Sequence, residues 1–324
     1  MRFLALAAFA GLLVAPHAWA QSAWRPEKQV EVIVPTAPGG GNDTFARLMQ
    51  KVLQEQKLVA TPVLVQNKSG GNQTLSVIYL NQHVADPHYL LFATSSLISN
   101  DIQGRGQYRY TDFPPLGLAF LDFSAFMVPV NSPFKTMREL LDRVKEDPDA
   151  VAFSVISRGG TSHAALAQAA KAAGIDPRRL KIVVFKTSAE ASTALMGGHI
   201  QAAVSSAAGS TPQVVASQIR MLGIASPQRR TGALAQVPTL AEIGVPATGL
   251  TTWRGVFGAK GIAPAQIAFW EDALARAFAS EEWQARMAEH NVAAPPLRGN
   301  ELAKYFEAQY AQTRSVLVEL GLAK

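Results

Sequence analysis

The sequence predicts an α/β fold made of two similar units, each with a mostly parallel sheet flanked by helices. Three observations support this prediction. Short β-rich runs alternate with helical patterns, as they do in βαβ units. The alternation restarts after a turn at residues 131–133. The chain has 324 residues, 48% of them hydrophobic and 17% charged, so it is long enough for two domains and too apolar for a disordered protein.

The first unit begins with Val30–Val34, where four of five residues are β-branched, a composition that predicts a strand. Residues 44–56 predict a helix because apolar side chains recur on one stripe. The other predicted elements of this unit are a helix at 74–82 and strands at 63–66, 90–93, 116–120 and 126–130.

The second unit repeats the pattern between two breaks. Its predicted helices are 137–145, 162–173 and 189–196, and its predicted strands are 152–155, 182–185, 202–205 and 220–225. A turn-rich break at 246–249 precedes a strand at 251–259, and three helices follow from Pro264 to near Leu322. We therefore expect the chain to cross between units near Val130 and Thr251. Residues 21–130 with 251–324 would form the first lobe and residues 131–250 the second.

The first twenty residues have the three-part pattern of a secretory signal peptide. Arg2 precedes an apolar run at 3–14, and Ala18-Trp19-Ala20 forms an A-x-A cleavage site. A twelve-residue helix is about 18 Å long, shorter than the ~30 Å hydrocarbon core of a membrane. We expect cleavage after Ala20 and export of the mature chain.

The chain contains no cysteine, which excludes disulfides, thiolate metal sites, thiol catalysis and attachment as a lipoprotein. The formal net charge of +6 is scattered along the chain rather than gathered in blocks. This distribution is compatible with anionic ligands and gives little support to nucleic-acid binding.

A glycine-rich loop at 35–44, Pro-Thr-Ala-Pro-Gly-Gly-Gly-Asn-Asp-Thr, lies between the first predicted strand and helix. Its three glycines leave backbone N–H groups unshielded, and the helix start adds further free N–H groups and positive potential. A carboxylate or phosphate would suit such a site. An ordinary turn with Asn42 or Asp43 as helix cap explains the pattern equally well. Thr44 replaces the third glycine of a dinucleotide-binding motif, and no P-loop Lys follows.

A similar loop, Ser-Arg-Gly-Gly-Thr-Ser-His at 157–163, joins a strand and a helix in the second unit. The two loops, one on each lobe, would face each other at the carboxyl ends of their strands. Arg158 would either add positive charge or be solvated. For His163 a structural role in the first helical turn is favoured over a ligand contact.

Hydroxyl groups also follow three other predicted strands, at Ser95, at Thr187 with Ser188, and at Ser205. Each is either a helix cap or a ligand contact, and capping is the commoner role. Trp253, near the second crossing, would either line a ligand site or pack the hinge.

Evidence for catalysis is weak. Ser132-Pro133-Phe134-Lys135 matches S-x-x-K without the motifs that accompany it in β-lactamases, so a helix cap is the better interpretation. No G-x-S-x-G, zinc-binding histidine spacing or paired carboxylates occur. Ser162 and His163 suggest a secreted hydrolase as an alternative, but adjacent helical residues point about 100° apart. We therefore predict a protein that is not an enzyme and needs no metal or cofactor.

Short motifs occur along the chain at 37–43, 46–47, 65–71, 159–163, 197–200, 237–240 and 253–257. Taken together and in order, these runs resemble the periplasmic solute-binding receptors of tripartite tricarboxylate transporters, also called Bug proteins. The resemblance covers essentially the whole mature chain. Three of the runs, the triple glycine, Gly-Gly-Thr-Ser-His and Trp-Arg-Gly-Val-Phe, resemble the tricarboxylate-receptor branch more than generic members.

The resemblance implies a two-lobe, flytrap-like periplasmic binding protein fold, in which both lobes hold a carboxylate largely through backbone N–H groups and bridging waters. It also implies a monomer that docks to a separate membrane permease; a ligand sensor that reports to a membrane kinase is an alternative role. The ligand-binding residues that it implies are Thr36, Pro38, Gly39, Gly40, Asn42, Asp43, Asn67, Gly70, Gly71, Ser95, Ser157, Gly159, Gly160, Thr161, Ser162, His163, Thr187, Ser188, Ser205 and Trp253.

Three departures from the family pattern concern the ligand. Phe185-Lys186-Thr187 stands where many members have Tyr-Lys-Gly, and serines at 205–206 replace an aspartate. Lys68-Ser69 replaces a Pro-Gly pattern, so the second loop of the first lobe has a different shape. Loss of a carboxylate from the cleft suits a more anionic ligand. Citrate-like tricarboxylates, C4 dicarboxylates, aromatic carboxylates and acidic amino acids all remain open.

Overall fold

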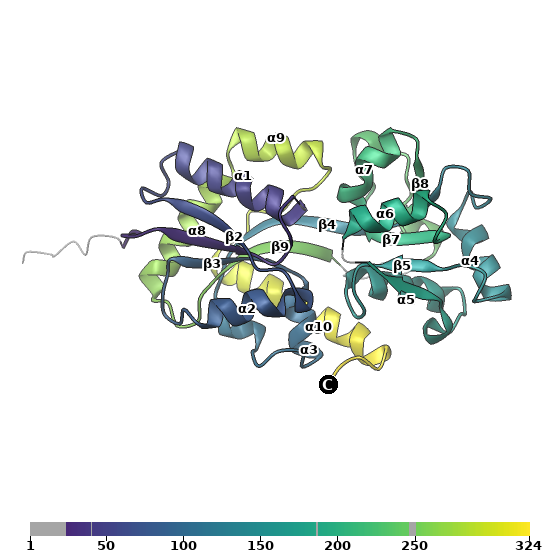
Figure 1. Cartoon of the computed structure of the whole chain (residues 1–324), viewed down its shortest axis with the longest axis horizontal. Helices are drawn as coiled ribbons and strands as arrows, with labels where there is room; N and C mark the ends of the chain where they lie inside the picture. Colours follow the sequence, from purple (N-terminus) through teal and green to yellow (C-terminus); the bar gives the residue numbers. More distant parts are fainter. Residues whose placement is uncertain (1–23, 40, 186, 246–250) are drawn as a thin grey trace, which may run out of the picture.

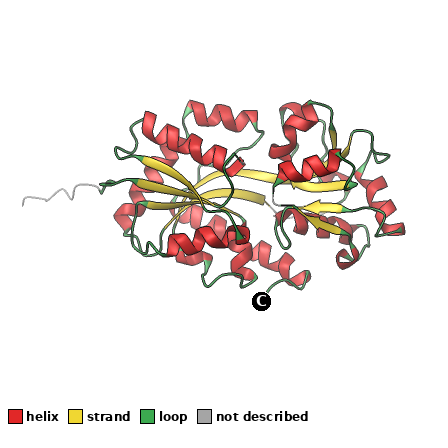
Figure 2. Ribbon diagram, in the orientation of Figure 1, coloured by secondary structure: helices red, strands yellow, loops and turns green. Residues whose placement is uncertain are grey.

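The structure is a computed structural model that describes residues 24–39, 41–185, 187–245 and 251–324. The expected signal peptide, the break at 246–249, Gly40 and Lys186 lie outside the described residues. Two groups of helices and strands lie side by side, joined by the long strands β4 (Pro115–Pro129) and β9 (Thr251–Gly258) (Figure 1). Helices cover both faces of the strands in each group (Figure 2).

We call the first group lobe 1; it also includes the beginning of β4 and most of β9. Its chain passes from β1 (Val30–Val34) and α1 (Gly41–Glu55) to β3 (Tyr89–Thr94), and it ends with three C-terminal helices. Its other elements are β2 (Val63–Asn67), α2 (Thr74–Asn81), α3 (Ser96–Ile102), α8 (Pro264–Phe278), α9 (Glu281–Glu289) and α10 (Gly299–Glu319).

We call the second group lobe 2; it lies around the second half of β4. Its elements are α4 (Met137–Glu146), β5 (Phe153–Val155), α5 (Thr161–Ala172), β6 (Ile182–Val184), α6 (Ser188–Met196), β7 (Ala202–Ser206), α7 (Ala207–Val215) and β8 (Ile219–Ile224). The α/β class predicted from the alternating pattern is thus confirmed.

The sheets of both lobes are mixed, and each contains one strand that runs against the others. In lobe 1 the order is β2-β1-β3-β9-β4, with β9 antiparallel to β3 and β4. In lobe 2 the second half of β4 pairs antiparallel with β7 and β8, while β5 pairs in parallel with β6 and β7. The reversed strands are therefore the two long strands that cross between the lobes.

Two details differ from the sequence prediction. The strands expected at 116–120 and 126–130 are one strand, β4, because Asp122 and Ser124 between them are buried within it rather than exposed in a turn. Helices α3 and α7 were not predicted. The sequence of α3 is rich in Ser and Asn, and α7 contains Gly209 and Pro212, residues that weaken helix propensity.

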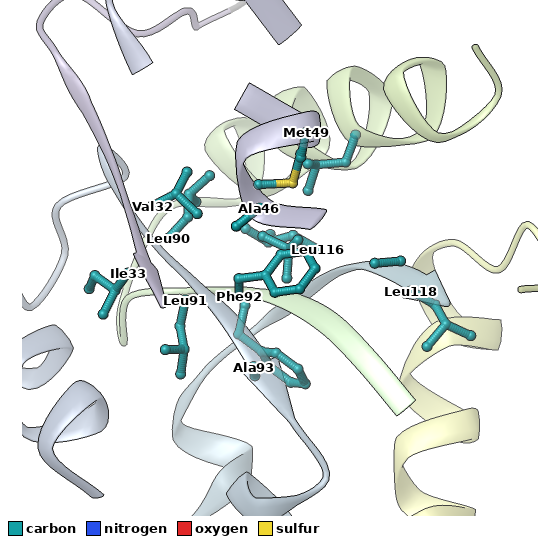
Figure 3. Packing of buried hydrophobic residues seen from close by; sticks show 14 of the residues in the cluster. Val32, Ile33, Ala46, Met49, Leu90, Leu91, Phe92, Ala93, Leu116 and Leu118 are labelled. Atoms are coloured by element: carbon teal, nitrogen blue, oxygen red, sulfur yellow. The ribbon is translucent and has the colours of Figure 1, made fainter. Parts of the chain in front are cut away.

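Each lobe has a hydrophobic core of its own. In lobe 1, Val32 and Leu90 of the sheet pack with Ala46 and Met49 of α1, beside Phe92 (Figure 3). In lobe 2, a second core joins the sheet to α4 and α5; it includes Phe126, Leu140, Phe153 and Leu166. Burying each large apolar side chain contributes about 1.5–3 kcal/mol. Because these two cores are separate, each lobe has its own source of stability.

The lobes also touch on both sides of the crossing strands, where α9 and α10 lie on opposite sides (Figure 1). On the α10 side, Val316 is buried with Ala164 of α5. On the α9 side, Arg230 Nη2 of lobe 2 donates to the carbonyl of Asn291, 2.7 Å away. Among the described helices, none has the length and apolar character needed to cross a membrane.

Candidate ligand-binding site

The loop after β1 is shaped by the carboxylate of Asp43, which is 3% exposed. Its Oδ2 accepts hydrogen bonds from Gly39 N at 2.8 Å and Arg47 Nε at 3.0 Å. Its Oδ1 accepts from Asn67 Nδ2 at 2.9 Å, and Asn67 Nδ2 also donates to the carbonyl of Thr36. Burial raises the pKa of Asp43, but the bonds from Arg47, Gly39 and Asn67 outweigh that effect and hold it below its ordinary value. Asp43 and Asn67 therefore position the loop.

Gly39 shows why the loop needs glycine. Its φ of 79° lies in the left-handed region, which side chains disfavour. Gly39 and Pro38 are exposed, so the turn faces solvent. The Thr36 hydroxyl oxygen is buried and has no hydrogen-bond partner among the described residues. The beginning of the loop therefore has unused polar capacity.

A second loop of lobe 1, between β2 and α2, has four successive residues with positive φ: Gly70, Gly71, Asn72 and Gln73. The two residues that are not glycine are held by side-chain bonds. Asn72 Oδ1 accepts from Ser96 Oγ at 2.9 Å, and Gln73 Oε1 accepts from Thr94 N at 2.9 Å. This backbone strain is a feature of functional loops.

The predicted site includes the two glycines of this loop but neither Asn72 nor Gln73. The run Gly-Gly-Asn-Gln was the available signal, because asparagine tolerates the left-handed region better than most residues. Ser95, which was predicted, precedes α3 as its N-cap and makes no side-chain capping bond.

The corresponding loop of lobe 2 is held by the first turn of α5. Gly159 N donates to His163 Nδ1 at 2.9 Å, and Ile156 N donates to Ser162 Oγ at 3.1 Å. Gly159 has a φ of 75°, as Gly39 has in lobe 1. The N-cap of α5 is Gly160, which has no side chain to bond the first-turn N–H groups. Those groups are therefore available to an anion.

Hydroxyl caps distinguish the other helix starts in lobe 2. Thr187 Oγ1 accepts from Glu190 N at the start of α6, and Ser206 Oγ accepts from Gly209 N at the start of α7. Thr187 is thus a helix cap, and Ser188 lies close to Gly209 of α7. The Ser205 hydroxyl is buried without a partner in the part of the chain that the structure describes.

Trp253 belongs to the core of lobe 1, so its prediction as a ligand contact is wrong. The side chain is 1% exposed, and its ring lies 4.8 Å from that of Phe306 and 5.8 Å from that of Phe257. Side chains alternate between the faces of a strand, so Trp253 and Phe257 point toward α10. Arg254 points to the opposite face.

Contacts of β9 join the glycine loops of the two lobes. Arg254 Nε donates to Asn42 Oδ1 in the first turn of α1. The hydroxyl of Thr252, two residues before Arg254, lies 2.7 Å from that of Thr161 in the first turn of α5. In addition, a Cβ placed on Gly159 would come within 2.7 Å of the Gln103 side chain at the end of α3. The lobe 2 loop thus packs directly against lobe 1.

Neither a cavity in lobe 1 nor any metal-ligating cluster of the described residues adds to this junction. A cavity of about 260 Å³ lies between β4, α8 and α9, and none of the predicted site residues lines it. No cluster of three or more metal-ligating side chains occurs within the described residues.

Comparison with known proteins identifies the family. Residues 45–322 match the tripartite tricarboxylate transporter family receptor. The chain belongs to this family. Its members are binding proteins of the periplasm and are not enzymes. The receptor is 27% identical over 248 residues to protein BugT of Bordetella pertussis, covering 74% of this chain and 73% of that protein.

Solved structures show the same fold as this receptor. One, described as a periplasmic transporter, is 25% identical, covers 92% of the receptor and 99% of its own chain, and has a TM-score of 0.81. MatC of Rhodopseudomonas palustris with bound malate is 22% identical, covers 90% and 99% of the two chains, and has a TM-score of 0.79. The predicted periplasmic binding protein fold is therefore confirmed.

The local geometry of the receptor also opposes the hydrolase alternative. Ser162 Oγ accepts from Ile156 N, and His163 Nδ1 accepts from Gly159 N. A nucleophile and its base need a hydrogen bond to each other. Burial, and then the nearby Arg158, lower the pKa of His163, so the ring is neutral at pH 7 and suited to accept the Gly159 bond. Arg158 itself is exposed to solvent.

Proposed function

We propose that this receptor captures a small molecule with two or three carboxylate groups between its lobes and delivers it to the membrane permease of a tripartite tricarboxylate transporter. The observation that carries the proposal is the contact between Thr161 and Thr252, which brings the glycine-capped start of α5 to the strand whose Arg254 contacts α1. The start of α5, which has no side-chain cap, together with the glycine loops, suits a carboxylate.

The proposed site differs from the sequence prediction in the roles of several residues. Asp43, Asn67, Ser162 and His163 shape the two glycine loops, and Trp253 is excluded. The residues that we propose to line the site are Thr36, Pro38, Gly39, Gly40, Asn42, Gly70, Gly71, Ser95, Ser157, Gly159, Gly160, Thr161, Thr187, Ser188 and Ser205.

Lobe closure would result from contacts made only in the closed form. Lobe 1 would move against lobe 2, with the two crossings as the hinge. The first crossing lies earlier than the expected position near Val130, because Phe123 pairs with β9 of lobe 1 whereas Ser124 already pairs with β7 of lobe 2. The second crossing is near Thr251, at the start of β9. Each charge-assisted hydrogen bond contributes about 1.5–3 kcal/mol. Three or four such bonds, less the cost of association, support binding near 1 μM, which corresponds to about −8 kcal/mol.

The ligand class is argued from charge and from one relative. MatC, which shares the fold, has malate bound. In this chain, Ser205 and Ser206 leave the end of β7 without a carboxylate, which favours a strongly anionic ligand. We place the receptor in the tricarboxylate branch on this ground. Export with cleavage after Ala20 is part of the same proposal.

A panel of ligands tests the proposal. Citrate, malate, aspartate and benzoate would each be titrated by calorimetry and by thermal shift into the mature chain. We expect di- or tricarboxylates to bind and benzoate to bind poorly. A ligand at 100 times its Kd stabilises the folded state by about 2.7 kcal/mol. The proposal fails if the protein is folded and no carboxylate stabilises it.

The junction between the lobes is tested by Thr161→Val, which keeps the shape of the side chain and removes its hydroxyl. Losing one hydrogen bond in the closed form should weaken carboxylate binding about 2- to 10-fold. Thr193→Val is the matched control, because Thr193 is an exposed residue of α6 whose hydroxyl donates to the carbonyl of Ala189 in the same helix. Equal affinities for the two variants would remove this contact from the proposed mechanism.

A further inference from the structure

Arg254 is the cation closest to the contacts that join the two glycine loops. It follows Trp253 on β9 and points to the opposite face, where it is only partly buried. Its Nε donates to Asn42 Oδ1, and its Nη1 donates to the carbonyls of Trp253 at 3.2 Å and Thr252 at 3.4 Å. The guanidinium carbon lies 5.7 Å from the centre of the Phe120 ring. These contacts fix the guanidinium at the start of α1.

The guanidinium still has donors to offer. An arginine side chain has five N–H donors. The contacts above use Nε and Nη1, and within the described residues Nη2 has no hydrogen-bond partner. The Arg254 side chain as a whole is half-buried, so part of it remains accessible to solvent. A fixed guanidinium with one free nitrogen is prepared for an acceptor from solution.

The charges around Arg254 leave an excess of positive charge. Arg254 interacts electrostatically with Asp122 of β4, and Arg230 of lobe 2 and His290 after α9 interact with the same carboxylate. The Asp122 carboxylate is 3% exposed and accepts from Phe123 N at 2.8 Å and Ala208 N at 3.3 Å.

Burial lowers the pKa of His290, and the nearby Arg286 lowers it further, so this histidine is neutral at pH 7. Two guanidinium groups therefore share one carboxylate. An uncompensated charge in a partly buried place is unfavourable, and an anion from solution would neutralise it.

We propose that Arg254 binds one carboxylate group of the ligand through Nη2, while the glycine loops hold another. This inference rests on the proposed function and adds a determinant of specificity to it. Guanidinium–carboxylate bonds are charge-assisted and stronger than bonds between neutral groups. The receptor should therefore prefer a ligand with two or more carboxylates over an analogue in which one carboxylate is an amide.

The test compares ligand and protein changes together. Malate, citrate and the monoamide of each would be titrated into the full mature wild type and into Arg254→Gln. In the wild type we expect the affinity for the better-bound acid to exceed the affinity for its monoamide by about 30- to 100-fold, because the monoamide loses one charged hydrogen-bond pair. In Arg254→Gln we expect this ratio to fall below about 3-fold.

Further variants separate binding from positioning. Arg254→Lys keeps the charge and should retain part of the ratio, so it also serves if Arg254→Gln fails to fold. Arg138→Gln removes the same charge from α4, where the Arg138 side chain is 91% exposed, and should leave the ratio unchanged.

The possible failures have different signatures. If Arg254→Gln weakens acid and amide equally and keeps their ratio, Arg254 only positions Asn42 and the inference is overturned. Arg254→Lys gives a second test, whether or not Arg254→Gln folds. If Arg254→Lys keeps the full wild-type ratio of acid affinity to monoamide affinity, the fork of the guanidinium has no role and the inference is also overturned. If the folded wild type binds neither acid, the proposed function itself fails.

Discussion

The glycine loops of the two lobes have similar sequences and are stabilised by different chemistry. In lobe 1 a buried carboxylate, Asp43, accepts from Gly39 N and is paired with Arg47. In lobe 2 a neutral imidazole, His163, accepts from Gly159 N. Both glycines stand four residues before their acceptor and have nearly the same φ. A glycine turn with nearly the same φ can thus be held by a charged or an uncharged side chain, with different consequences for stability and pH dependence.

The largest effect should come from removing the charged acceptor. Asp43→Ala leaves Gly39 N, Asn67 and Arg47 without their shared partner, and we expect a loss of roughly 2–4 kcal/mol in the free energy of unfolding. Urea denaturation measures it. Asp142→Ala, which removes an exposed carboxylate 3.7 Å from Arg138 on α4, should cost under about 0.5 kcal/mol. Equal losses for the two variants would contradict the role given to Asp43.

The two glycines provide the next comparison. Gly39→Ala strains only the backbone, because no atom of the described residues, other than its chain neighbours, lies within 4 Å of the added Cβ, and it should cost about 1 kcal/mol. Gly159→Ala adds the same strain and also places Cβ 2.7 Å from the Gln103 side chain, so we expect about 2 kcal/mol.

Only the lobe 2 variant should also separate the lobes, because Gln103 belongs to lobe 1. Small-angle scattering in the presence of excess ligand would detect that separation. If Gly39→Ala separated the lobes and Gly159→Ala left their separation unchanged, the comparison would be reversed.

The smallest effect concerns pH. The pKa of His163 is lower in the folded protein than its ordinary value of 6.5, so the folded state binds fewer protons than the unfolded state. The contribution of His163 to the free energy of unfolding is complete above pH 6.5 and declines as the pH falls below that value. The pKa of Asp43 lies below its ordinary value of 3.8, so the lobe 1 contribution is lost only in stronger acid.

Amide hydrogen exchange distinguishes the two loops. Between pH 7.5 and 5.5, and after correction for the intrinsic rate, the Gly159 N–H should lose protection while the Gly39 N–H keeps it. His163→Asn, whose side-chain oxygen can accept the same bond, should remove the pH dependence at Gly159. Parallel behaviour of both amides in the wild type would show that the acceptors do not differ in this way.

Prediction from the sequence succeeded where the signal was local. The alternation of apolar and polar residues placed most helices and strands, and glycine runs marked both loops because few other residues adopt their backbone. It failed where burial changed the meaning of a residue. Asp122 and Ser124 looked like a break between two strands and instead lie buried inside β4. Trp253 looked like a ligand contact because the side of the strand that faces the core could not be known in advance.

By itself, the sequence determined the α/β class, the order of most elements and the two glycine loops, since each depends on residues within one turn or strand. Only the tertiary structure decided which side chains brace those loops and which cation accompanies them. Arg254 reaches Asn42 across 212 positions of the chain, and Thr252 reaches Thr161 across 91. Such pairs depend on the direction and register of β9 between β3 and β4, which no local pattern encodes.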